Sequence, residues 1–374
     1  MASNTQTKVS LSGRGFTDQD IENIISKEVV GKNCIELDLS SNFITQRGAA
    51  ALANELRFNS TLTHLNLTNN RIGNKGMKHI SDSLKENRTL SELMIGGNDI
   101  DQDGAIHLGA VLEDNQTLTV LMLQNNGILA DGFLRLANAL KVNKTLNHLS
   151  VVNNHITTNS NMLTTLSDAL KTNQTLILLD LWDNQIKDDG AKAIADGLEI
   201  NKALQYLYLG KNEITDDGAV HIARALKKNT TLAHLYIRKN RIKTAGGIKL
   251  AEALKTNSSL TQLYLYQNEI SDEGAKQLAD ALKTNKTLAI LDIAGNNIGD
   301  AGAQYLADAL KENTTLHELD VSENKISGTG AEKLAEKIRT KTTTFLLNLE
   351  GNEIQDKLKL IAIVTANRRL TIKI

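Results

Sequence analysis

The chain has 374 residues and a net charge of −1, because 42 basic and 43 acidic side chains nearly cancel. This balance argues against a duplex-DNA binder, and no run of about 18 apolar residues is present that would span a membrane. The polar start, MASNTQTKVSLSGRG, lacks the apolar core of a secretory signal, and the single cysteine, Cys34, allows no intramolecular disulfide. Both features predict an intracellular, cytoplasmic location.

Residues 1–33 form a degenerate first copy of a repeated unit. Val9, Leu11 and Phe16 keep the apolar positions of that unit, so this segment is predicted to cap the N-terminal end of the core. Cys34 stands at a leucine position of the first full copy. It is therefore expected to be a buried, unreactive side chain.

The rest of the chain repeats a unit of 28 residues that is anchored by an asparagine. Each unit reads L-x-x-L-x-L-x-x-N-x-I, then G-A, then L-A-x-A-L-K-x-N-x-T. Ten of the eleven spacings between anchors are 28 residues, and one is 30. The anchors are Asn42, Asn70, Asn98, Asn126, Asn154, Asn184, Asn212, Asn240, Asn268, Asn296, Asn324 and Asn352. Such a unit cannot bury its own apolar face, so stacked copies must share one continuous core.

Within each unit the spacing of apolar residues changes from that of a strand to that of a helix. Leucines two residues apart point to one face of a strand, and the anchor asparagine satisfies the turn that ends it and meets its copy in the next unit. The spacing of Ala275, Leu278, Ala279 and Leu282 then predicts a helix. An acidic residue such as Asp272 is expected to cap the start of its own helix, and Asn285 to end it in a left-handed conformation. Acidic residues recur near the predicted helix starts, as at Asp188 and Asp189. We attribute them to the favourable interaction of negative charge with the N-terminal end of a helix.

Two segments break the regular pattern. The 30-residue unit, HITTNSNMLTTLSDAL, has lost its glycine, and a protruding or mobile loop is predicted at Thr157 to Asn161. At the C-terminal end the glycine is replaced by Leu358, and the alternation of Leu370, Ile372 and Ile374 predicts a last strand.

The outward positions of four consecutive units are rich in aromatic residues. If the leucines three and five residues before each anchor point inward, the residues two, four and six before it face outward. Five of the six tyrosines and the only tryptophan occupy such positions. Neighbouring parallel strands lie about 4.8 Å apart, so Tyr208, Tyr236 and Tyr264 are predicted to stack as a column.

Two interpretations of this cluster are open. An aromatic ladder could stabilise the strands by about 0.2–1 kcal/mol per pair. Alternatively, aromatics next to arginine form a binding hot spot. Binding is favoured, because the other units use Asp, Ser, Asn or Met on equally good strands. The candidate partner-binding residues are Trp182, Tyr206, Tyr208, Lys211, His234, Tyr236, Arg238, Lys239, Arg241, Tyr264 and Tyr266.

The sequence contains no recognisable catalytic or metal-binding signature. G-x-x-x-x-G-K-[ST], H-E-x-x-H and G-x-S-x-G are all absent, and GRGFTD at Gly13 lacks the third glycine of a dinucleotide fingerprint. His64, His148 and His234 share one offset but lie several units apart, too far to hold one metal. We therefore predict that the protein is not an enzyme and uses no cofactor or metal.

The repeated motif resembles that of the leucine-rich-repeat family, and within it the ribonuclease-inhibitor-like class with 28-residue units. The resemblance extends from about Val9 to Ile374. It implies an α/β solenoid (horseshoe) with a parallel β-sheet on the concave face and α-helices on the convex face. One domain over 1–374 is expected, with an N-terminal cap (1–33), twelve repeat strands (34–354) and a C-terminal cap (355–374).

The resemblance implies a non-catalytic protein-protein interaction module that binds a protein partner in its concave face. Such repeats occur in intracellular innate-immune receptors and in bacterial effectors. Abundant Asn, Lys, Thr and Ile with no proline suggest a bacterial effector secreted into the host-cell cytoplasm, where it acts on a host protein. The alternative is a regulator of an enzyme, such as a GTPase-activating or enzyme-inhibitor protein of this repeat class. A monomer with a protein partner, no nucleic acid and no membrane insertion is expected.

Overall fold

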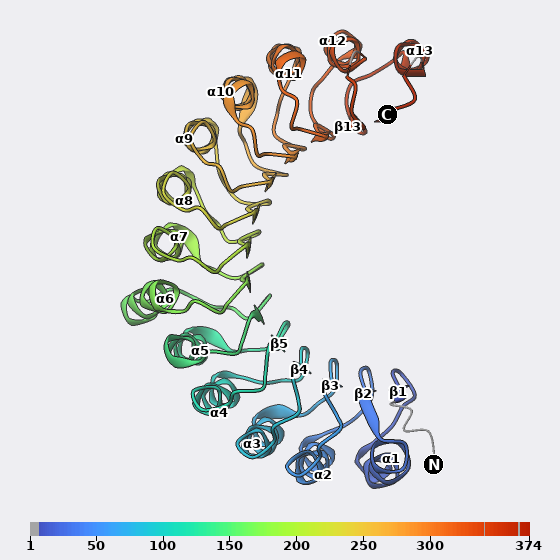
Figure 1. Cartoon of the computed structure of the whole chain (residues 1–374), viewed down its shortest axis with the longest axis vertical. Helices are drawn as coiled ribbons and strands as arrows, with labels where there is room; N and C mark the ends of the chain where they lie inside the picture. Colours follow the sequence, from blue (N-terminus) through green and yellow to red (C-terminus); the bar gives the residue numbers. More distant parts are fainter. Residues whose placement is uncertain (1–6, 340, 366) are drawn as a thin grey trace. The chain divides into compact units, whose positions relative to one another are not determined.

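The computed structural model describes residues 7–339, 341–365 and 367–374. Its contacts divide the chain into two compact units, Met1–Gln185 and Ile186–Ile374. Within each unit the strands are parallel and follow the order of the sequence. Each unit, taken by itself, curves so that its strands lie on the inner side and its helices on the outer side (Figure 1). The predicted fold class, a parallel sheet covered by one layer of helices, is confirmed.

The first unit begins with a cap and continues with alternating strands and helices. Its elements are β1 (Thr7–Ser10), η1 (Asp18–Asp20), α1 (Ile21–Ile24), η2 (Ile25–Val30), β2 (Cys34–Asp38), α2 (Gln46–Leu56), β3 (His64–Asn66), α3 (Gly73–Leu84), β4 (Glu92–Met94), α4 (Gln102–Leu112), β5 (Val120–Met122), α5 (Leu129–Val142), β6 (His148–Ser150), α6 (Ser160–Thr172) and β7 (Leu178–Asp180).

The second unit has the same alternation and ends on a strand. Its elements are α7 (Lys187–Leu198), β8 (Tyr206–Tyr208), α8 (Asp216–Leu226), β9 (His234–Tyr236), α9 (Thr244–Leu254), β10 (Gln262–Tyr264), α10 (Ser271–Thr284), β11 (Ile290–Asp292), α11 (Asp300–Glu312), β12 (Glu318–Asp320), α12 (Gly328–Ile338), β13 (Phe345–Asn348), α13 (Lys357–Thr365) and β14 (Leu370–Lys373).

The core is formed by the leucines of the strands and the apolar stripe of the helices. Leu207 in β8 and Leu209 directly after it are both fully buried, and the side chain between them, Tyr208, points to the other face. From α8, Ile222 and Leu226 are buried against this layer. Every unit thus contributes its apolar residues to a core that it shares with its neighbours.

The anchor asparagines connect each repeat to the one before it. The side-chain amide of Asn240 donates to the carbonyls of Leu209 (2.9 Å) and Ile237 (2.9 Å). Its carbonyl oxygen accepts from the backbone N–H groups of Asn212 (2.9 Å) and Ile214 (3.1 Å). These bonds satisfy buried backbone groups at the turn after each strand, as the sequence predicts.

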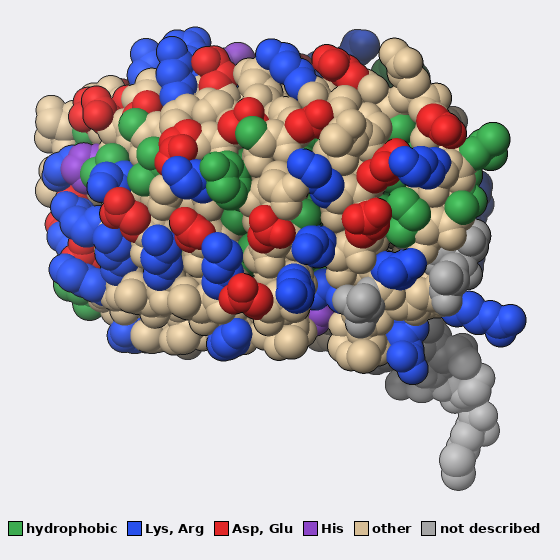
Figure 2. Space-filling view, turned by 90° about the horizontal axis from the view of Figure 1, so that it is seen from above, with side chains coloured by type: hydrophobic (Ala, Val, Ile, Leu, Met, Phe, Trp, Pro, Cys, Tyr) green, Lys and Arg blue, Asp and Glu red, His purple; other side chains and the backbone are tan. Residues whose placement is uncertain are grey.

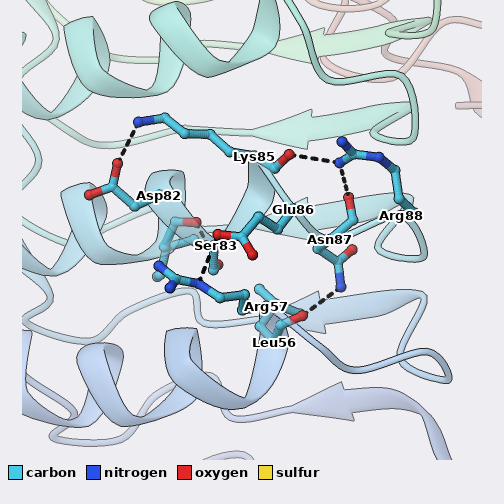
Figure 3. A network of polar contacts seen from close by, with 9 residues as sticks. Leu56, Arg57, Asp82, Ser83, Lys85, Glu86, Asn87 and Arg88 are labelled. Atoms are coloured by element: carbon cyan, nitrogen blue, oxygen red, sulfur yellow. Dashed lines mark hydrogen bonds and ion pairs between the residues drawn. The ribbon is translucent and has the colours of Figure 1, made fainter.

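The asparagine that follows each helix has a different role from the predicted one. Asn285 has an extended backbone (φ −68°, ψ 133°), so the predicted left-handed end of the helix is wrong. Its side-chain amide donates to the carbonyl of Leu254 in the preceding helix (2.8 Å), and its oxygen accepts from the N–H of Leu288 (2.7 Å). Asn87 makes the equivalent bond to Leu56, which lies in a network of charged residues at the ends of α2 and α3 (Figure 3). The side chain thus combines a local turn bond with a bond to the preceding repeat.

The acidic residues at the helix starts also act between repeats. Asp272 lies inside the first turn of α10, so the predicted cap of its own helix is wrong. Its Oδ1 atom instead accepts from the backbone N–H groups of Gly299 (2.7 Å) and Gly302 (2.9 Å) in the next repeat. A Cβ on Gly302 would lie 2.7 Å from this oxygen and 2.5 Å from Ile298 Cγ2. The glycine of the G-A pair is therefore explained by the close approach of Ile298 in the same repeat and of Asp272 in the preceding one.

The 30-residue unit places its two additional residues before α6. This helix starts six residues after Asn154, and Asn159 caps it by accepting from the N–H of Met162 (2.9 Å). Thr157 forms an isolated parallel bridge with Gln185. Only Thr157 to Asn159 of the predicted loop precede the helix; the prediction is wrong for Ser160 and Asn161, which form the first turn of α6 because Asn159 caps it. The protrusion or mobility of this segment stays a prediction.

Both ends of the repeat array add a strand. β1 pairs with β2, and Leu11 is buried, whereas Val9 and Phe16 are only half-buried. At the other end β14 pairs with β13, which confirms the predicted last strand. Cys34 is fully buried as expected, and burial raises the pKa of its thiol, so the nucleophilic thiolate is disfavoured.

Candidate functional site

The inner face of the second unit carries an aromatic surface across β8, β9 and β10. Strand pairing aligns Tyr206 with His234 and Tyr208 with Tyr236, and then Tyr236 with Tyr264. Residues of one strand alternate between the core and this face, so both rows of rings point away from the leucines. We call the following residues the tyrosine surface: Tyr206, Tyr208, His234, Tyr236, Arg238, Lys239, Tyr264 and Tyr266.

The predicted column of tyrosines is present. The ring centroids of Tyr208 and Tyr236 are 4.2 Å apart, and those of Tyr236 and Tyr264 are 4.3 Å apart, with planes inclined by 7° in both pairs. A second, shorter stack pairs Tyr206 with His234 at 4.3 Å. Because the rings cover one another, each tyrosine is half-buried, and it presents its edge and hydroxyl group outward.

Two cations lie over these rings. The guanidinium carbon of Arg238 is 5.5 Å from the ring centre of Tyr236 and 5.6 Å from that of Tyr264. Lys239 Nζ lies 5.7 Å from the ring centre of Tyr266. These distances are within the range of cation–π attraction, so the rings hold the positive charges at the surface. The other two predicted cations lie nearby in the sequence: Lys211 is exposed, and Arg241 pairs with Glu213 at 3.2 Å.

The position of Tyr266 depends on residues that the sequence did not indicate. Its hydroxyl donates to Glu323 Oε2 (2.9 Å), 57 residues further along the chain. The repeat between them has Gly295, whose backbone is left-handed (φ 61°) and where a Cβ would lie 3.4 Å from the Tyr266 ring. Small residues at positions 294 and 295 are the signal that could have predicted this bridge.

Of the predicted site residues, Trp182 alone belongs to the first unit. It follows β7 and is half-buried, and its backbone N–H donates to Asp180 Oδ1 (3.0 Å). All other predicted residues belong to the second unit, where stacking and cation–π contacts connect the members of the tyrosine surface.

A hydrogen bond found in other repeats weighs against a purely stabilising role for the tyrosines. At the position of Tyr208, six of the other repeats have Asp or Asn, whose side chain can accept from the backbone N–H two residues later, while two have Met and one has Ser. Examples are Asp292 with Ala294 (3.1 Å) and Asn66 with Thr68 (3.0 Å). A phenol ring cannot fold back to make this bond, which typically contributes about 1 kcal/mol. The repeats with tyrosine therefore lack a hydrogen bond whose contribution to stability is about as large as that of ring stacking.

The carboxylates next to the tyrosines have an unusual environment. Burial raises the pKa of Asp292 to about 6, and the negative charges of Asp320 and Glu318 act in the same direction, while Arg238 opposes them. Burial, Tyr236 and the negative charges of Glu318 and Asp292 raise the pKa of Tyr264, so its hydroxyl stays protonated and donates to Gln262 Oε1 (3.1 Å). The positive charge of the surface thus gives way to negative charge after β10.

Neither a metal-binding cluster nor a membrane-spanning helix is present among the residues that the structure describes. Within the described ranges, no group of three or more His, Cys, Asp or Glu side chains is placed to hold a metal ion. The helices of the described residues are all too short or too polar to cross a membrane. On the face shown in Figure 2, Lys and Arg are interspersed with Asp and Glu, and hydrophobic side chains form small separate groups. The tyrosine surface, with its packed aromatic rows, differs from such a mixed surface.

Comparisons with known proteins agree with this architecture. A family model described as Leucine Rich repeat matches nine segments, which together cover more than half of the chain: 34–53, 58–81, 86–109, 172–195, 201–223, 228–251, 256–279, 284–307 and 312–335. No curated protein sequence matches the chain. The crystal structure of an internalin from Listeria monocytogenes str. 4b F2365 is similar, with a TM-score of 0.56 and 20% sequence identity over 98% of this chain and 86% of that chain. Identity this low shows likeness of fold alone.

Proposed function

Because the chain belongs to the leucine-rich-repeat family, we propose that it is a non-catalytic interaction module that binds a protein partner through the tyrosine surface. The observation that carries this proposal is the stacked column of Tyr208, Tyr236 and Tyr264 with Arg238 lying over two of its rings. Tyrosine and arginine are the residues enriched in binding hot spots. Held rigid by stacking, they lose little side-chain entropy when a partner binds.

The repeat class that we propose is the ribonuclease-inhibitor-like one. Its support is the combination of the 28-residue spacing of most repeats with a helix of 11 to 14 residues in each repeat from α2 to α12. We also propose a single repeat domain with a cytoplasmic site of action. The effector role stays a prediction from composition, because likeness of fold to an internalin carries no information on function.

Binding can be tested without a known partner. Peptide ligands are selected from a phage-displayed random library on the full chain, and their Kd is measured for the wild type and for the double variant Tyr208→Ala/Tyr236→Ala. We expect weakening by at least about 2 kcal/mol, or roughly thirtyfold, if these rings are hot-spot residues. The matched control is Asp38→Ala/Asn66→Ala, which changes the equivalent positions of two repeats in the first unit.

Two outcomes of this experiment would contradict the proposal. If the control variant weakens the ligands as much as the tyrosine variant does, or if neither variant changes Kd, the tyrosine surface is not the preferred binding surface. Circular dichroism of both variants checks that the fold is intact. The alternative, regulation of an enzyme, is separated from plain binding by assaying GTP hydrolysis of a panel of GTPases with and without the protein.

A further inference from the structure

Beyond the tyrosine surface, β11, β12 and β13 carry two rows of side chains on the same face. Strand pairing aligns Ile290, Glu318 and Leu346 in one row, and Asp292, Asp320 and Asn348 in the other. All six side chains are half-buried. The first row places one carboxylate between two aliphatic side chains, and the second row places two carboxylates directly beside it.

A cavity of about 510 Å³ opens beside the first row. Its lining includes Ile290, Glu318 and Leu346 together with His317 and three threonines. Its walls therefore combine two aliphatic side chains with one carboxylate. The long aliphatic stem and charged head of an arginine or lysine have the matching distribution of apolar and charged surface.

The hydrogen bonds to the two aspartates of this area come from neutral groups. Asp292 accepts from the N–H of Ala294, and Asp320 accepts from Ser322 and from the amide of Asn348 (2.8 Å). The positive charge of Arg238 lowers the pKa of Asp292, but burial and the negative charges of Asp320 and Glu318 outweigh it. The negative charge of this area is therefore compensated only in part within the chain.

The charge of Asp292 is also unnecessary for the local fold. Asn348, at the equivalent position, makes the same turn bond to the N–H of Glu350 (3.2 Å) without a charge. An aspartate at position 292 instead retains a half-buried negative charge that its neighbours Glu318 and Asp320 disfavour. Retaining this charge is useful to binding if the partner brings a cation to it.

We propose that the partner places an arginine or lysine side chain over β11 to β13, with its stem on Ile290 and Leu346 and its charged head at Asp292 and Glu318. This inference rests on the proposed function, because the neighbouring tyrosine surface supplies the apolar anchor of the same partner. The cations of that surface, Arg238 and Lys239, repel a basic side chain. Positive charge at the tyrosine surface and negative charge on β11 and β12 thus determine the orientation of the partner on this face.

The test uses the peptides selected on the full chain. Selected sequences are expected to be enriched in Arg or Lys, and the Asp292→Asn/Glu318→Gln variant should weaken them by at least about tenfold. A synthetic peptide with its basic residues replaced by glutamine should bind the wild type about tenfold more weakly than the original peptide does. The same replacement should change the affinity for the Asp292→Asn/Glu318→Gln variant only slightly. Such non-additivity demonstrates a direct pairing. Asp38→Asn/Glu36→Gln, in the first unit, is the matched control and should leave Kd unchanged.

Failure of this inference can be distinguished from failure of the proposed function. If Tyr208→Ala/Tyr236→Ala weakens the peptides but Asp292→Asn/Glu318→Gln does not, binding at the tyrosine surface stands and the basic side chain is refuted. If neither variant has an effect, both are refuted. If sedimentation shows self-association that Asp292→Asn/Glu318→Gln abolishes, the occupant is a second copy of the chain, and the separate partner is refuted.

Discussion

Replacing Asp292 by asparagine should stabilise the protein at neutral pH. The carboxyl of Asp292 is half-buried, and its neighbours on this face are Tyr264, Arg238, Glu318 and Asp320. Burial and the two acidic neighbours outweigh Arg238 and raise its pKa from 3.8 to about 6. Asparagine keeps the oxygen that accepts from Ala294 and removes only the charge.

The magnitude and its pH dependence follow from this pKa. Between pH 3.8 and about 6 the folded state binds more protons at Asp292 than the unfolded state does, so stability falls as the pH rises through this window. At pH 7 the whole penalty is present. At about 1.4 kcal/mol per pKa unit, it is on the order of 2–3 kcal/mol. Asp292→Asn should therefore raise the free energy of unfolding by about this amount at pH 7, and by close to zero near pH 4.

The assay is urea unfolding of the wild type and Asp292→Asn at a series of pH values. A matched control is Asp38→Asn in the first unit, where the side chain makes the same turn bond to Ser40 (3.0 Å) and also accepts from the Ser10 hydroxyl. If Asp292→Asn is destabilising at pH 7, or if its effect does not shrink toward pH 4, the reasoning about buried charge is refuted. A gain in stability together with weaker peptide binding would show that the aspartate serves binding.

Three further predictions concern the repeat framework. Leu207→Ala removes a fully buried side chain and should cost about 2–5 kcal/mol in chemical denaturation, whereas Tyr236→Ala, which is half-buried, should cost less. Gly302→Ala should lower the unfolding midpoint, because its Cβ would lie 2.5 Å from Ile298 Cγ2; Ala301→Ser in the same turn, at an exposed position, should change it little. Backbone amides at Thr157 to Asn161 should exchange with deuterium faster than those of the loop before α8, Glu213 to Thr215, and equal rates would contradict the predicted mobility.

Much of the fold could be predicted because the environment of a residue in a stacked repeat depends mainly on its offset from the anchor. The leucines on either side of Tyr208 had to be buried, since they recur at strand spacing in every unit. The tyrosine column followed from the same logic, since equal offsets in neighbouring units are aligned by parallel pairing. Even the location of the two additional residues before α6 was evident from the loss of the regular spacing.

The tertiary structure decided which partner each polar side chain selects. Asp272 was expected to cap its own helix and Asn285 to end its own helix locally, but both bind backbone groups of a neighbouring repeat. The Tyr266 hydroxyl reaches Glu323 two repeats away, across the repeat that contains Gly295. Arg238 lies over two rings at once. Apolar burial follows from periodicity because it has no direction, whereas a hydrogen bond or a cation–π contact requires a distance and an angle that only the packed neighbours define.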